Sequence, residues 1–270
     1  DLKEAAARQA GADRFVLADA PDLSAMLAAE APIDAVIECS GAPAAITLAF
    51  DMVKRGGRVV LVGENDHYKP LAVMLRRLVA EGTIGEMVFG HFMTVAHRLK
   101  GASDWRNDEA MAGGDAFFEE GIHWLHLAGS LGPRITSISG YRPTPATVGP
   151  DRRAKSMLAS FTYDNGAVGS LYYSREVPSL FKGLRVSKLM GRSGVMTFES
   201  NGGFVFVRGT RGTQLLFPGF RDIRGYQAMY RDFRDAIHHG RAPQMTVERA
   251  MDDQRLMRSE EHTSELQSRE

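Results

Sequence analysis

Hydrophobic and polar positions follow two different patterns along the chain, and the change falls near residue 64. Before it, short apolar runs at residues 35–39 and 58–62 are separated by Ala-rich or amphipathic stretches. Such runs are typical of buried strands, and the stretches between them favour helices. Strands joined by helices of about ten residues predict a parallel sheet with right-handed crossovers. Residues 1–64 are therefore predicted to form part of an α/β domain.

Within this part, we expect helices at residues 5–10, 23–30 and 44–54 and a further short strand at residues 14–18. Gly11 is placed to end the first helix, and Gly56-Gly57 to turn the chain before the strand at 58–62. These elements make up the alternation of helix and strand on which the α/β prediction rests.

From residue 65 the pattern changes to helices followed by many strands. Amphipathic helices are predicted at residues 71–81 and 117–131, with a strand between them that ends by residue 99. Alternating strands follow, several joined by hairpin turns, and the last helices are expected at 225–239 and 247–257. The expected strands span residues 135–141, 157–163, 168–174, 184–190, 195–200 and 203–208. This order predicts an α+β domain with a largely antiparallel open sheet.

Composition excludes several functions. Lys+Arg and Asp+Glu both number 33, so the formal net charge is zero and does not favour nucleic acid or an anionic membrane as a partner. No apolar run is long enough to cross a bilayer. The single cysteine, Cys39, excludes an internal disulfide and a multi-cysteine zinc site, and we expect a cytoplasmic protein.

Both ends of the chain carry unusual signals. The N-terminus has neither an initiator methionine nor a signal-peptide pattern and reads as a helix already under way, so we expect the chain to begin inside a gene. Residues 258–268 read RSEEHTSELQS, which resembles the translation of a sequencing adapter. We therefore expect residues 258–270 to be an artefactual tail that follows a second domain of residues 65–257.

Residues 1–64 offer positions for a cofactor without the usual fingerprint, because no G-x-G-x-x-G follows a strand and opens a helix. Ser40, Gly41 and Gly63 come directly after predicted strands, and ligands bind at the carboxyl ends of strands in open α/β sheets. The alternative is that these residues only turn the chain. In spacing, residues 11–63 resemble the later strands of a Rossmann-like cofactor domain, such as that of medium-chain alcohol dehydrogenases.

A more specific motif lies in residues 108–132, which read DEAMAGGDAFFEEGIHWLHLAGSLG. It contains a Gly-Gly pair, a short apolar run, an acid, and then Gly-apolar-His with an apolar helix continuing. Together with residues 66–86, 161–166 and 233–250, it resembles the Gfo/Idh/MocA family of oxidoreductases, which includes glucose–fructose oxidoreductase and inositol dehydrogenase. The resemblance extends over most of residues 64–257.

This resemblance implies hydride transfer between a sugar- or cyclitol-like hydroxyl and NAD or NADP, while a side chain takes the hydroxyl proton. His123 occupies the histidine position of the motif, and an imidazole with a pKa of about 6.5 exchanges protons near neutral pH. Glu119, where the family has aspartate, lies one helical turn earlier and is expected to orient or charge-balance the imidazole. The alternative for His123 is a core histidine bonded to the backbone.

Further polar residues near the motif are candidates for contacts with substrate. His126 lies one turn further along the same helix and is expected either to pack in the core or to face the substrate. Asp104, Trp105 and Arg106 precede the motif and either line the substrate pocket or form a solvated loop.

The family also has a Glu-Lys-Pro motif, whose lysine assists cofactor placement and proton transfer. Lys69-Pro70 matches part of it, but its neighbours fit the family's later Tyr-x-Pro element better, and a crossover helix and strand before it are missing. The first strand–helix unit, which holds the phosphate-binding turn, is missing as well. We therefore expect cofactor binding by this chain to be weak or absent.

No metal site is expected, because the histidines lack the H-x-x-x-H and H-E-x-x-H spacings. The family resemblance implies a homo-oligomer, since the broad sheet face of its second domain packs against other subunits. Three interpretations stay open. The chain is an oxidoreductase, a non-catalytic fragment that acts through assembly of its sheet, or a junction of alcohol-dehydrogenase-like and Gfo/Idh/MocA-like pieces.

Overall fold

The computed structural model describes most of the chain in two compact units, residues 1–62 and 63–270. The described residues are 2–9, 11–16, 20, 22–29, 33–38, 48–49, 51–61, 64–97, 116–143, 155–178 and 183–267. No helix among these residues is long and apolar enough to cross a membrane.

The described residues of unit 1 include the helices α1 (Leu2–Gln9) and α2 (Leu23–Ala28) and the strands β1 (Ile33–Glu38) and β2 (Val53–Leu61). Residues 48–49 and 51–52 are helical as well, within the helix predicted at 44–54. The strands pair in parallel, which confirms the small parallel sheet predicted for this part. The last aligned pair joins Glu38 to Leu61, so both strands end at the same edge.

One boundary in unit 1 differs from the prediction. β2 begins at Val53, inside the segment expected to be helical, and not at residue 58. Its register with β1 jumps from Ile33–Val53 to Ala35–Arg58. The residues between, which include Gly56-Gly57, therefore form an irregular part of the strand where a turn was expected. Residues 14–16 have no regular structure, and the rest of the strand expected at 14–18 lies outside the described residues.

Unit 2 begins with helical elements, which a strand and a further helix follow. A short 3-10 helix, η1 (Asn65–Tyr68), leads into α4 (Pro70–Ala80), where Pro70 occupies the first turn that tolerates a missing N–H. β3 (Met87–Val95) and α6 (Ala116–Gly129) come next. The remaining elements are β4 (Ile135–Tyr141), β5 (Ser156–Tyr163), β6 (Val168–Ser174), β7 (Val186–Gly191), β8 (Gly194–Glu199), β9 (Val205–Gly209), β10 (Gly212–Leu216), α7 (Tyr226–His239) and α8 (Val247–Gln267).

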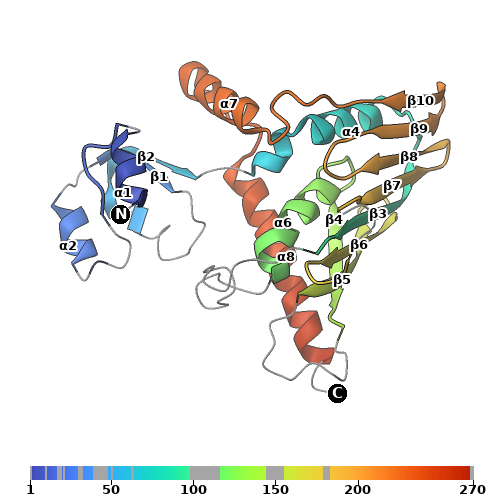
Figure 1. Cartoon of the computed structure of the whole chain (residues 1–270), viewed down its shortest axis with the longest axis horizontal. Coiled ribbons are helices and arrows are strands. Elements are labelled where there is room, and N and C mark those ends of the chain that lie inside the picture. Colours follow the sequence, from blue (N-terminus) through green and yellow to red (C-terminus); the bar gives the residue numbers. More distant parts are fainter. Residues whose placement is uncertain are drawn as a thin grey trace. The chain divides into compact units, whose positions relative to one another are not determined.

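The strands of unit 2 form one eight-stranded sheet in the order β10-β9-β8-β7-β3-β6-β5-β4 (Figure 1). β3 pairs in parallel with β6, and every other neighbouring pair is antiparallel. This confirms the largely antiparallel sheet predicted from the sequence. β10 was not predicted, because its residues are exposed or half-buried and show no alternation of apolar and polar side chains.

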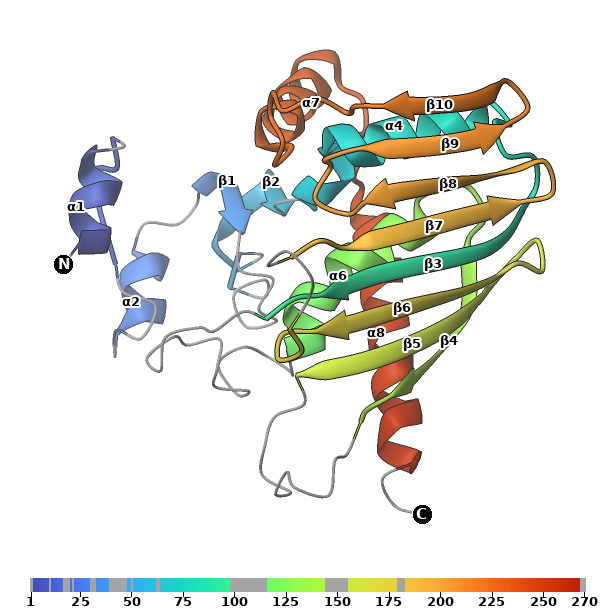
Figure 2. The same cartoon turned by 45° about the vertical axis from the view of Figure 1, so that its right-hand side comes forward.

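Alternation along the strands divides the sheet into a buried and an exposed face. In β5 the inward residues Met157, Ala159, Phe161 and Tyr163 are buried, and α4, α6 and α8 cover this face (Figure 2). Phe92 of β3 lies at the centre of the core, with its ring close to other buried aromatic rings. The last helix, α8, continues through the segment 258–267, which was expected to be a tail.

The core position of Phe92 gives a test of the fold. We expect Phe92→Ala to lower the free energy of unfolding of unit 2 by about 3–5 kcal/mol, because the fully buried ring leaves a cavity. Urea unfolding followed by circular dichroism measures this change. Phe220→Ala is the matched control, since 73% of Phe220 is exposed and its loss leaves no cavity. Equal effects of the two substitutions would contradict the placement of Phe92.

Candidate active site

The apolar side of helix α6 faces the sheet, and His123 lies at the edge of that side. Phe117 and Leu125 are fully buried, and a Cβ on Gly121 would come within 2.4 Å of the Phe117 ring. The glycine of the Gly-apolar-His motif is therefore needed to make room for an aromatic ring one turn earlier. His123 lies two residues further on and keeps 39% of its side chain exposed.

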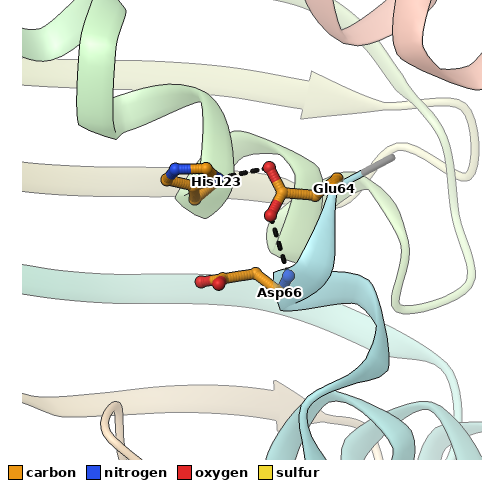
Figure 3. Close-up of side chains that lie close together, drawn as sticks. All are labelled: Glu64, Asp66 and His123. Carbon is orange, nitrogen blue, oxygen red and sulfur yellow. Dashed lines mark hydrogen bonds and ion pairs between the residues drawn. The ribbon is translucent and has the colours of Figure 1, made fainter. Parts of the chain in front are cut away.

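The partner of the His123 ring is Glu64, the residue that caps η1. The Oε1 atom of Glu64 accepts a hydrogen bond from the backbone N–H of Asp66 at 2.8 Å. Its Oε2 atom forms a hydrogen bond and ion pair with Nδ1 of His123 (Figure 3). The second ring nitrogen, Nε2, points away from Glu64, so it is the atom available for exchange with another molecule.

A second ion pair lies beside the first. The Nζ atom of Lys69 is 2.6 Å from Oδ2 of Asp66, within the same short segment. The cluster therefore holds two carboxylates, one ammonium and one imidazole. When the imidazole is protonated, these four charges balance.

Electrostatics favour the charged form of this histidine. Desolvation acts to lower the pKa of His123, but the hydrogen bond and the charge of Glu64, helped by Asp66, raise it to about 9. Desolvation also acts to raise the pKa of Glu64, and the bond and charge of His123 outweigh it, so that this pKa is lowered. The imidazolium and the carboxylate thus stabilise each other's charge.

The pH range over which this ion pair stabilises the fold follows from the raised pKa of His123 and the lowered pKa of Glu64. The contribution of His123 to stability is complete below its ordinary pKa of 6.5 and is lost as the pH rises through about 9. The contribution of Glu64 is complete above its ordinary pKa of 4.5 and is lost as the pH falls through the lowered value. Both contributions are fully present between these two ordinary values.

Glu64, Asp66 and His123 are the residues among those described that could together hold a metal ion, with ligand atoms within 4.8 Å of one another. A metal would have to displace the proton of His123 and the ammonium of Lys69, since metal ligands bind in their deprotonated form. The balanced charges therefore suit proton transfer better than metal binding.

The structure changes the expected partner of His123. Glu119 forms an ion pair with Arg175 and not the predicted contact that would orient the imidazole. Arg175 also contacts Glu120 and donates from Nε to the Tyr173 hydroxyl at 2.7 Å. Desolvation acts to lower the pKa of Arg175, but Tyr173 and the two carboxylates raise it. Arg175 is 6% exposed, and the two carboxylates balance its buried charge.

His126 lies in the core and does not face a substrate. It is 2% exposed, and its Nδ1 atom is 2.7 Å from Oδ2 of Asp253 on α8. Its Nε2 atom is 2.9 Å from Nδ1 of His67 on η1, which is also buried. Of the two expectations for His126, the structure supports packing, because helix α6 turns this residue inward.

The remaining candidates lie outside the described residues. These are the cofactor candidates Ser40, Gly41 and Gly63 and the substrate candidates Asp104, Trp105 and Arg106. The sequence prediction missed Glu64, Asp66 and His67. A run of polar residues directly after an apolar strand was the available signal, and it ends in a buried histidine.

Two family models match the sequence in two overlapping parts. Residues 73–195 match the GFO/IDH/MocA C-terminal domain, and residues 1–105 match the zinc-binding dehydrogenase model. Both resemblances predicted from the sequence are thereby confirmed. A comparison with curated protein sequences gave no match.

Several solved structures of oxidoreductases share the fold. A levoglucosan dehydrogenase in complex with NADH and levoglucosan has a TM-score of 0.72 at 16% identity, over 97% of this chain and 86% of that chain. An Agrobacterium radiobacter oxidoreductase in complex with NAD+, L-tartaric acid and magnesium has a TM-score of 0.68 at 15% identity, over 90% and 75%. A Caulobacter crescentus aldose-aldose oxidoreductase complexed with glycerol has a TM-score of 0.68 at 16% identity, over 82% and 65%.

The ion pair between His123 and Glu64 gives a direct test. We expect the ring of His123 to titrate near pH 9 in the full chain, and Glu64→Gln to bring its pKa to 6.5 or below, because desolvation then acts without the opposing carboxylate. NMR of chain labelled with carbon-13 at the histidine rings measures both values, with His123→Gln to assign the signal. A pKa that Glu64→Gln leaves unchanged would show that the two side chains do not pair.

Proposed function

We propose that the chain is an NAD(P)-dependent oxidoreductase that acts on a hydroxyl of a small sugar- or cyclitol-like substrate. The observation that carries the proposal is a half-exposed histidine whose Nδ1 is held by a carboxylate while Nε2 points away from it. This histidine lies within the residues that match the GFO/IDH/MocA C-terminal domain. Among the similar structures, one is a complex with NADH and levoglucosan, and another is a complex with glycerol.

The parallel strands of unit 1 fit a nicotinamide dinucleotide. β1 and β2 end at the same edge of their sheet, and the sequence continues after each of them with small residues. These residues include Ser40, Gly41 and Gly63, which are the proposed cofactor contacts. Small residues at the carboxyl ends of parallel strands let a dinucleotide approach the backbone closely. The bound nicotinamide would supply the hydride chemistry.

His123 is the proposed proton-transfer residue, and Glu64 holds its charge. In the reduction direction, the protonated Nε2 donates to the carbonyl oxygen that becomes the hydroxyl. In the oxidation direction, the same nitrogen takes the proton of the substrate hydroxyl. Since the pKa of His123 is raised to about 9, the residue is a proton donor at neutral pH. The site therefore favours reduction at neutral pH and oxidation at higher pH.

A second role, assembly into a homo-oligomer, is favoured by the exposed face of the sheet. Five apolar side chains on this face come from four strands, and their exposed fractions run from 41% to 52%. They are Phe89, Tyr141, Val168, Tyr172 and Phe206. An antiparallel sheet normally turns polar residues to solvent, so a broad apolar face indicates a partner surface. We propose that a second copy of the chain covers it.

The enzymatic proposal is tested by hydride transfer with the full chain. We expect NADH or NADPH to support reduction of a polyhydroxy ketone or aldose. Cofactor is titrated up to millimolar concentration, because the sequence predicts weak cofactor binding by this chain. His123→Asn should lower the rate by about 10²–10⁴-fold, because it removes the proton donor. The rate of reduction should fall as the pH rises through about 9, and Glu64→Gln should move this fall to lower pH.

The control for these variants is His238→Asn, which changes an exposed histidine at the end of α7 and should leave the rate unchanged. Turnover that survives His123→Asn would rule out the assigned role of His123. Cofactor binding without turnover of any polyhydroxy substrate would count against the proposed substrate class.

The assembly proposal is tested by molar mass in solution. We expect the full chain to form a homo-oligomer that the double variant Phe89→Asp and Tyr172→Asp converts to smaller species, because buried carboxylates would lack partners. Size-exclusion chromatography with light scattering measures this. Val73→Asp, at an exposed position on α4, is the matched control and should leave the mass unchanged. A monomeric chain would exclude this surface as an assembly interface.

A further inference from the structure

Two pairs of side chains join η1 to α6, and they repeat at the same spacing on both elements. Glu64 contacts His123, and His67, three residues later, contacts His126, three residues after His123. Residues three apart lie on one side of an α-helix and nearly eclipse one another in a 3-10 helix. The two contacts therefore lie one after the other between the same two segments. We call Glu64–His123 the first rung and His67–His126 the second rung.

The rungs differ in exposure. In the first rung, 39% of the His123 side chain is exposed. In the second rung, His126 is 2% and His67 is 3% exposed, and their ring nitrogens are 2.9 Å apart. The first rung is accessible to another molecule, and the second is sealed in the core.

The second rung is anchored to a third element. Nδ1 of His126 lies 2.7 Å from a carboxylate oxygen of Asp253, whose helix α8 packs against both α6 and the sheet. Desolvation, with the charges of Arg76, His126 and Arg249, lowers the pKa of His67 to about 3, so this ring is neutral. The two facing nitrogens, Nδ1 of His67 and Nε2 of His126, share one proton in this bond, while Nδ1 of His126 faces the Asp253 carboxylate.

Other bonds hold η1, but they lead to other helices. The hydroxyl of Tyr68 donates to Asp232 of α7 at 2.9 Å, and Arg76 of α4 donates to the carbonyl oxygen of His67. Asn65 donates to the carbonyl oxygen of Arg224, just before α7, at 2.7 Å. Among the side-chain hydrogen bonds of the described residues, only the two rungs tie η1 and its cap to the helix that carries His123.

We propose that the buried chain Asp253–His126–His67 is a positioning device that sets the distance between Glu64 and His123. The proposal rests on the proposed function, in which Glu64 and His123 form the acid–base pair, and it assigns the setting of that pair to residues that touch neither substrate nor cofactor. The second rung holds η1 in one position along α6. Without it, the Glu64 carboxylate can move away from the imidazole of His123.

The test exploits which ring nitrogen each histidine uses. A glutamine amide can take the place of Nε2 and an asparagine amide that of Nδ1, because their nitrogen and oxygen atoms extend to matching distances from the backbone. His126 uses Nε2 in the second rung. His126→Gln therefore keeps the hydrogen bond to His67, and His126→Asn breaks it. His67 uses Nδ1, so the pattern is reversed: His67→Asn keeps the rung and His67→Gln breaks it.

The measurement is the pKa of the His123 ring in the full chain, by NMR of carbon-13 labelled histidine. We expect it to stay near 9 in His126→Gln and His67→Asn and to fall toward 6.5 in His126→Asn and His67→Gln. A general loss of stability would affect both amides at each position alike and would not give this crossed pattern.

Two results would overturn the proposal: a His123 pKa that stays near 9 in all four folded variants, or one that falls equally in all of them. Thermal unfolding of each variant establishes that it is folded before titration. The pKa does not depend on turnover, so the crossed pattern together with an inactive chain would reject the proposed function and keep the positioning device.

Discussion

Burial of one face of the eight-stranded sheet is the constraint on which the site depends. Alternating apolar residues on the strands can leave water only if helices cover them, and α4, α6 and α8 do so on one side. This fixes the rotation of α6, because Phe117 and Leu125 must face the sheet. His126 is then turned into the core while His123, three residues earlier, is left half-exposed. One packing requirement thus separates a buried histidine from a half-exposed one.

Charge at the site depends on mutual support between partly desolvated groups. Alone, His123 would lose its proton more readily in this setting, and Glu64 would hold one more tightly. Each ionises because the other does. The adjacent pair of Asp66 and Lys69 adds no net charge, so the proton on His123 decides the charge of the whole cluster. A substrate carbonyl would meet a proton donor whose strength is set by Glu64.

Local patterns in the sequence predicted the elements well and the pairing of side chains poorly. The bounds of β4 and β6 agree with the predicted strands to the residue, because alternation of apolar positions is a local property. Glu119 was chosen as the partner of His123 by helical spacing, yet Arg175, 56 positions later, pairs with it. The actual partner, Glu64, is 59 positions before His123. Such contacts depend on how helices pack on the sheet, which periodicity does not specify.

The contacts of η1 join residues that the two family matches cover separately. Glu64 and His67 lie only within the match to the zinc-binding dehydrogenase model, while His123 and His126 lie only within the match to the GFO/IDH/MocA C-terminal domain. Joining unrelated pieces would not be expected to create two matched rungs, one of them buried and hydrogen-bonded at both ends. Residues 64–68 therefore pack as part of unit 2, although the match to the zinc-binding dehydrogenase model extends through them to residue 105. The division of the chain into compact units between residues 62 and 63 agrees with this packing. The ion pair of Glu64 and His123 is consequently formed within unit 2 alone.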